Sequence, residues 1–127
     1  MLIHLDTSVL VDAFTGTRRS LRQVTAATAA GHVLAYCAIV EYEWQRGPRV
    51  DAETSAVKDF FGGDQVVAFG GSEAALAASL YRRVKRARQR QADLAVAACT
   101  IDRGARLWTL NDADFKDLPE LLLYQPD

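Results

Sequence analysis

Residues 92–115 read ADLAVAACTIDRGARLWTLNDADF, and this stretch decides the fold. Its first part, Ala92–Arg103, is rich in small and apolar residues and predicts a helix that ends at Gly104. Arg106–Leu110 predicts a strand, which leads directly into the polar segment Asn111–Asp114. A helix, a glycine turn and a strand in this order are typical of proteins in which helices cover a parallel sheet.

The same alternation of strands and helices extends through the rest of the chain. Further strands are expected at Leu2–Leu5, His32–Ala38, Val66–Phe69 and Leu121–Tyr124. A further helix is expected from Thr7 or Ser8 to Phe14, and others at Arg18–Ala30, Ile39–Arg46, Asp51–Phe61 and from an N-cap at Ser72 to Ala87. This order predicts a three-layer α/β/α sandwich with a mostly parallel central sheet. No linker or repeat interrupts residues 1–127, so we expect a single domain.

Composition narrows the class of protein. Half of the 127 residues are apolar and the net charge is −1, which is typical of a globular domain with one core. Cys37 and Cys99 lie in apolar segments and are expected to be buried thiols, not part of a disulfide scaffold. Neither a signal peptide nor an apolar run of membrane-spanning length is present. We therefore expect a cytoplasmic protein with no membrane partner.

Acidic residues stand in four short signatures that lie far apart in the sequence. They are Asp6 in residues 2–10 (LIHLDTSVL), Glu43 in 38–44 (AIVEYEW), Asp93 in 91–98 (QADLAVAA), and Asp112 with Asp114 in 108–115 (WTLNDADF). Asp6 and the last pair directly follow strands, and the carboxyl ends of parallel strands meet at one edge of a sheet. Asp93 opens an apolar helix, where the alternative interpretation is a first-turn acid favoured by the helix dipole.

Convergence of these acids predicts a metal site. Carboxylates packed together repel one another, which raises their pKa values unless a hard cation lies among them. Mg²⁺ prefers oxygen ligands and uses one or two carboxylates directly. We expect Asp6 and Asp93 to be the direct ligands, with Glu43 and Asp114 holding metal-bound water or a second ion. Such a metal would activate water and neutralise charge on a phosphorus centre, which indicates phosphate chemistry.

These segments resemble those of the PIN-domain nucleases, and in particular of the VapC-type toxins of bacterial toxin–antitoxin pairs. LDTSVLVD is similar to the opening strand end of that family, and AIVEYEWQRG to its segment in which a Glu precedes a Gly by four residues. Residues 92–115 resemble its Asp-x-x-Ile-Ala-Ala helix and Thr-x-Asn-x-x-Asp-Phe strand end. The chain departs from the pattern at Cys37 and Val40, where Ser and Thr are usual.

The resemblance chooses between two neighbouring glutamates. Glu41 and Glu43 are two residues apart and face different ways on a helix. Only Glu43 precedes Gly47 by four residues, so the motif selects Glu43.

The last motif assigns Asn111 and Asp114 and leaves Asp112 at a variable position. Asp112 nonetheless adjoins the expected site and could replace or assist Asp114. Ser8 and Thr109 are the hydroxyl candidates for orienting the carboxylates, together with Asn111.

The resemblance implies an endoribonuclease that depends on Mg²⁺ or Mn²⁺ and inhibits translation by cutting RNA. It also implies a cognate antitoxin as partner, with a homodimer or a toxin–antitoxin hetero-oligomer as the assembly. Six basic residues precede Asp93 and would hold the RNA backbone; the alternative is a solvated helix face. This basic cluster consists of Arg82, Arg83, Lys85, Arg86, Arg88 and Arg90.

Three other functions compete with the toxin. A phosphatase of the haloacid dehalogenase type would need a second aspartate two residues after Asp6, where this chain has Ser8. A PIN nuclease could also act in RNA processing outside a toxin–antitoxin pair. A catalytically degenerate RNA-binding or interaction module is disfavoured because all four acidic positions are filled.

Overall fold

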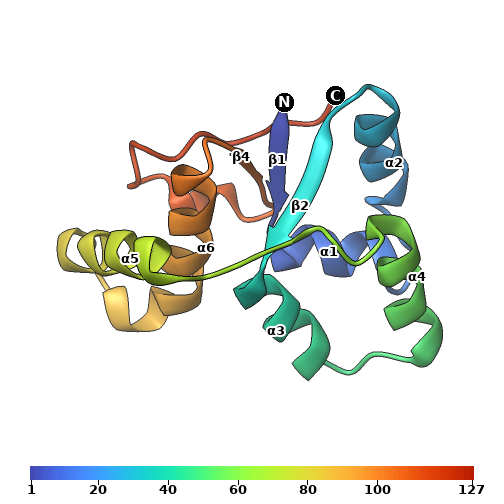
Figure 1. Ribbon diagram of the computed structural model, residues 1–127, viewed down its shortest axis with the longest axis horizontal. Coiled ribbons are helices and arrows are strands. Elements are labelled where there is room, and N and C mark those ends of the chain that lie inside the picture. The colour runs from blue at the N-terminus through green and yellow to red at the C-terminus, as the bar shows by residue number, and fades with distance from the viewer.

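Four parallel strands form the centre of the molecule, in the order β3–β2–β1–β4 (Figure 1). The computed structural model describes residues 1–127. The strands are β1 (Leu2–Leu5), β2 (Val33–Cys37), β3 (Val66–Val67) and β4 (Arg106–Trp108). Because all of them run the same way, their carboxyl ends lie at one edge of the sheet, away from the two chain termini (Figure 1).

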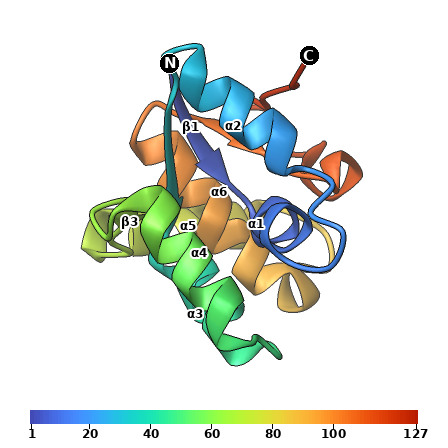
Figure 2. The ribbon, with the colours of Figure 1, turned by 90° about the vertical axis from the view of Figure 1, so that its right-hand side faces the viewer.

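Helices cover both faces of the sheet, which confirms the predicted α/β/α sandwich. Helices α5 and α6 pack together on one face, and α1, α2 and α4 lie on the other (Figures 1 and 2). Helix α3 follows β2 directly and contacts both α1 and α6. The bounds are α1 Thr7–Phe14, α2 Leu21–Ala29, α3 Ala38–Arg46, α4 Asp51–Phe61, α5 Gly71–Arg83 and α6 Gln91–Asp102. None of these helices has the length and apolar character needed to cross a membrane.

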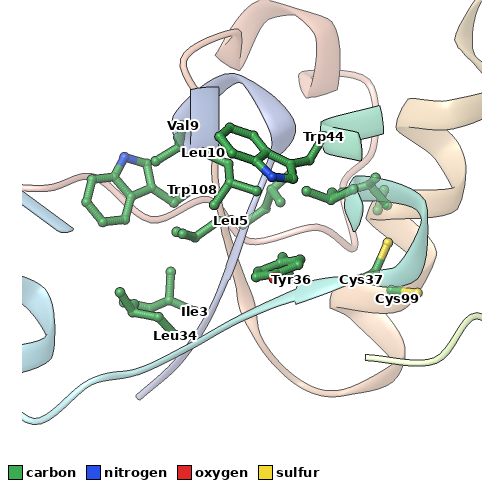
Figure 3. Close-up of a cluster of buried hydrophobic side chains, with 14 of the residues drawn as sticks. Ile3, Leu5, Val9, Leu10, Leu34, Tyr36, Cys37, Trp44, Cys99 and Trp108 are labelled. Carbon is green, nitrogen blue, oxygen red and sulfur yellow. The ribbon is translucent and has the colours of Figure 1, made fainter. Parts of the chain in front are cut away.

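The core is one cluster of buried side chains that joins the sheet to both helical layers (Figure 3). Ile3 and Leu5 of β1 are fully buried within it, as expected for a central parallel strand. Cys37 and Cys99 are free thiols and both are buried, which confirms the sequence-based expectation.

Helix α5 differs from the prediction at both ends. Its N-cap is Gly70, whose N–H donates to the Glu73 carboxylate at 2.8 Å, and Ser72 instead donates to Asp102 at 3.0 Å. The helix ends at Arg83 rather than Ala87, because Val84 is extended, and Arg86 then adopts a left-handed conformation with φ of 56°. A 3₁₀ turn, Ala87–Arg90, then leads into α6.

Strand predictions were too long where the backbone bonds to side chains. β4 ends at Trp108 instead of Leu110, because the Leu110 N–H donates to the Ser8 hydroxyl at 3.0 Å. The predicted last strand, Leu121–Tyr124, forms only a single parallel bridge, between Leu123 and Leu107 of β4. β2 and β3 are likewise shorter than expected, and α2 begins at Leu21 because Arg18 is left-handed.

His4 makes the stability of the fold depend on pH. Its ring is 1% exposed in β1 and its Nε2 has no partner, so burial, with a contribution from Arg103, lowers its pKa from 6.5 to about 4. A depressed pKa means that the unfolded chain binds the proton more readily, so stability is lost as pH falls from 6.5 towards 4. Between pH 7 and pH 5 this loss should amount to about 2 kcal/mol.

Chemical denaturation of wild type and His4→Gln at the two pH values measures this contribution. The glutamine variant should lose about 2 kcal/mol less than wild type on acidification, since other titrating groups act equally in both. Equal losses in the two proteins would show that His4 does not titrate as stated.

Candidate active site

Asp6 directly follows β1, which ends at Leu5, and is the N-cap of α1. Its N–H donates to the Trp108 carbonyl at 2.9 Å, so pairing with β4 continues to this position and holds its side chain at the carboxyl edge of the sheet. Oδ2 accepts hydrogen bonds from Thr109 Oγ1 at 2.7 Å and Ser8 Oγ at 3.0 Å. Oδ1 accepts none, so one oxygen is fixed by the protein and the other is free for a ligand.

The two hydroxyls that orient Asp6 are themselves oriented by the backbone. Ser8 Oγ accepts from the Leu110 N–H at 3.0 Å, and Thr109 Oγ1 accepts from the Asn111 N–H at 3.0 Å. Because a carboxylate oxygen can only accept, the single proton of each hydroxyl is directed at Asp6. Asn111 therefore acts through its main chain, and its side chain makes no hydrogen bond.

Glu43 reaches the same edge from α3. Its Oε1 accepts from Thr7 Oγ1 at 2.6 Å, and Thr7 follows Asp6 directly in the chain. Its Oε2 lies 3.6 Å from Arg46 Nη2. Glu41, in contrast, accepts from Gln45 of its own helix at 2.6 Å. Sequence reasoning missed Thr7, although its place between Asp6 and Ser8 in the opening motif was an available signal.

Asp93 stands in the first turn of α6 and is the electrostatic centre of the group. Its partly buried carboxylate accepts no hydrogen bond and forms no ion pair. Its pKa is raised to about 6, most strongly by burial and then by the negative charges of Asp6, Asp114 and Glu43, against the opposing effect of Arg90. Four segments distant in sequence thus bring their acids within electrostatic reach of one carboxylate.

The two acids of the last motif have different surroundings. Asp112 accepts a hydrogen bond from Gln125 Nε2 at 2.7 Å, on the side of the C-terminal segment. Asp114 is the one whose charge acts on Asp93, and its carbonyl accepts from Arg90 Nη2 at 3.0 Å. Arg90 also forms a two-pronged ion pair with Asp117, at 2.6 and 2.7 Å. The turn that carries Asp114 is therefore tied to the segment that precedes Asp93.

The acids do not form a ready-made cage for a metal. No three His, Cys, Asp or Glu side chains lie close enough together to hold an ion between them. What the site offers is a free oxygen on Asp6 and a carboxylate on Asp93 that lacks any donor. All the donors are hard oxygens, and Mg²⁺ needs only one or two carboxylates when it keeps its waters. The residues present therefore fit a hydrated Mg²⁺ or Mn²⁺ better than a metal that requires a closed protein shell, such as structural zinc.

The structure divides the basic cluster. Arg83 is ion-paired with Glu120, and Arg90 with Asp117. Arg82 lines a hollow beside Tyr81 and Leu94 on the face of α5 and α6. Lys85, Arg86 and Arg88 are exposed and make no side-chain ion pair.

Comparison with known proteins shows the family of this chain. The family model of the PIN domain matches residues 3–121, which carry all the acids described above. The chain belongs to the PIN domain family. Members of this family are generally nucleases. A comparison with curated proteins gave no match.

Solved structures show the same fold over the full length of this PIN domain. The chain is similar to one in VapBC2 from Rickettsia felis bound to a DNA fragment from their promoter, with 22% identity, complete coverage of both chains and a TM-score of 0.77. It is similar to one in VapBC-1 from nontypeable Haemophilus influenzae, with 15% identity, 98% coverage of both and a TM-score of 0.77. A toxin–antitoxin complex from Klebsiella pneumoniae gives 20% identity, coverage of 97% of this chain and 98% of that chain, and a TM-score of 0.73.

Proposed function

We propose that residues 1–127 form a single nuclease domain that cleaves RNA in a Mg²⁺- or Mn²⁺-dependent reaction. The observation that carries the proposal is the environment of Asp93, which has no donor and is surrounded by the charges of Asp6, Asp114 and Glu43. Such an arrangement is unfavourable without a cation and is typical of functional sites. Bound Mg²⁺ would be held by Asp6 and Asp93, and would supply water activation and neutralisation of charge on the phosphate.

Neighbouring residues of the chain position Asp6, Glu43 and Asp114. Thr109 and Ser8 hold Asp6 so that Oδ1 faces away from its protein partners. Thr7 fixes Oε1 of Glu43, and Oε2, which lies 3.6 Å from Arg46 Nη2, would hold a metal-bound water. Arg90 holds the turn of Asp114 beside Asp93. No histidine is available as a general base, because His4 is buried in β1 and His32 lies 3.2 Å from the N-terminal amine.

We propose further that the nuclease is the toxin of a toxin–antitoxin pair, acts in the cytoplasm and inhibits translation. Support comes from the likeness to chains of VapBC complexes, in which the alignment covers 98–100% of this chain and of the matched chains. The partner would be a cognate antitoxin that covers the acidic edge, in a hetero-oligomer or together with a homodimer of this chain.

Two experiments test the two levels of the proposal. The purified chain should cleave single-stranded RNA with Mg²⁺ or Mn²⁺, and EDTA should stop the reaction; cleavage that is unaffected by EDTA would exclude the metal. Expression of the chain alone should arrest growth, and co-expression of a small protein encoded next to it should relieve the arrest. RNA cleavage without growth arrest would instead favour a PIN nuclease of RNA processing, and absence of both would favour a degenerate binding module.

The pKa of Asp93 gives a prediction for metal binding that does not depend on cleavage. A carboxylate with a pKa of about 6 is mostly ionised at pH 7 and mostly protonated at pH 5, so protons compete with the metal only at the lower pH. Mn²⁺ should therefore bind about tenfold more weakly at pH 5 than at pH 7. Electron paramagnetic resonance of free Mn²⁺ measures the affinity, with near-UV circular dichroism as a control that the protein is folded at both pH values. Equal affinities would contradict the role of Asp93 as a ligand.

A further inference from the structure

A hollow of about 360 Å³ lies beside Asp114, at the end of the acidic site. Two segments form it: the connection between α5 and α6, and the 3₁₀ turn after β4 with the residues that follow that turn. It is lined by Lys85, Arg86, Arg90, Ala113, Asp114, Lys116 and Asp117. Its volume corresponds to roughly ten water molecules, which is sufficient for a phosphodiester group and its hydration.

The charges in this hollow favour an anion. Its walls carry four cationic side chains and two carboxylates. Arg90 and Asp117 neutralise each other through their two-pronged ion pair, so Arg90 builds the wall and is not available to a ligand. Lys85, Arg86 and Lys116 remain, and the structure gives none of their side chains a hydrogen bond or an ion pair.

The backbone conformation of Arg86 indicates that the fold places Lys85 and Arg86 at the hollow specifically. Arg86 adopts a left-handed conformation, φ 56° and ψ 36°, which is unfavourable for a residue with a side chain. Together with the extended Val84, at which α5 ends, this residue separates the basic cluster into two groups. Lys85 and Arg86 line the hollow, whereas Arg82 lines the apolar hollow on the face of α5 and α6 and Arg83 bonds to Glu120. Lys116 joins the first group from a segment 30 residues further along the chain.

We propose that Lys85, Arg86 and Lys116 form a binding site for a backbone phosphate of the RNA strand, next to the phosphate that is cut. This inference rests on the proposed function, because it takes the acidic edge as the place of cleavage. The hollow offers three positive charges and no group that would recognise a base. The three side chains therefore bind the phosphodiester and do not distinguish the base sequence. They position the strand beside Asp114 and contribute to affinity, while the acids carry out the reaction.

The test compares two triple variants that remove the same charge from the basic segments. The first removes the cations of the hollow, Lys85→Gln, Arg86→Gln and Lys116→Gln. The second removes cations outside it, Arg82→Gln, Arg83→Gln and Arg88→Gln. Both are made in an Asp6→Asn background so that a fluorescent single-stranded RNA is bound and not cut, and thermal melting checks that both are folded.

The hollow variant should bind RNA at least about tenfold more weakly than the parent, and the control variant less than about threefold more weakly. The slope of log affinity against log salt concentration should fall by about 0.7 in the hollow variant, as expected for the loss of the contact to one phosphate of a single strand. A single-stranded DNA of the same sequence should show the same weakening, since the phosphate is the shared feature. Equal losses in the two variants, or none in the first, would overturn the site while leaving the nuclease proposal intact. A parent that binds neither RNA nor DNA would overturn both proposals.

Discussion

Replacement of Asp93 by asparagine should reduce RNA cleavage by at least about 100-fold, and Asp6→Asn should do the same. Each change keeps the shape of the side chain and removes the negative charge that a divalent cation needs. The 100-fold figure corresponds to about 3 kcal/mol of transition-state stabilisation, within the several kcal/mol that a metal ion contributes. Initial rates on a labelled RNA at saturating Mg²⁺ measure the effect.

The stability of the Asp93→Asn variant separates a catalytic role from a structural one. Because burial and the surrounding negative charges raise the pKa of Asp93, its ionised form destabilises the folded protein at pH 7. The asparagine variant should therefore be at least as stable as wild type while it is inactive. Asp102→Asn, at the exposed opposite end of α6, is the matched control and should retain activity. Undiminished cleavage by Asp93→Asn would remove this residue from the site.

The same assay decides between the two acids of the last motif. Asp114 acts electrostatically on Asp93, whereas Asp112 is engaged by Gln125. We expect Asp114→Asn to reduce cleavage at least about tenfold more than Asp112→Asn does. A larger loss in Asp112→Asn would assign the fourth position of the site to Asp112.

Sequence patterns predicted the bounds of helices and strands well where the hydrophobic periodicity and a terminating glycine indicate the same boundary. The strand Leu2–Leu5 and the helix Asp51–Phe61 have the predicted bounds, and Gly62 closes this helix with φ of 71°. The first helix begins at Thr7, one of its two predicted starts, and ends at Phe14 as predicted. Errors arose where tertiary contacts outweigh local preference. Nothing in the local sequence around Arg86 indicates a left-handed residue, and Ala87 continues an apparently helical composition.

Sequence patterns also named the acids, but they could not give the hydrogen bonds among them. Motif spacing pointed to Asp6, Glu43 and Asp93, and the structure brings these to one edge of the sheet. The bond from Thr7 to Glu43 joins residues 36 positions apart, and the ion pair of Arg90 with Asp117 joins residues 27 positions apart. Such pairs depend on how β1, α3 and the turn after β4 meet, which no local pattern encodes.

Trp44 anchors the helix that carries Glu43, and its removal should strongly lower stability. Its side chain is 1% exposed within the cluster of Figure 3, and the Arg49 guanidinium lies 4.3 Å from the ring centroid and covers it. Trp44→Ala should lower the free energy of unfolding by about 3–5 kcal/mol, which corresponds to a fall in Tm of about 10–20 °C. Thermal and chemical denaturation measure both quantities.

Tyr42 provides the matched control, because it lies two residues earlier on the same helix and is 61% exposed. Tyr42→Ala should change stability by less than about 0.5 kcal/mol, apart from the contact with Arg46. Glu43 lies between these two residues, so its position depends on the packing of Trp44 and not on the exposed side of α3. Well below its Tm, Trp44→Ala should therefore cleave RNA more slowly than Tyr42→Ala does. Equal rates in the two variants would show that Thr7 alone is sufficient to hold Glu43 in place.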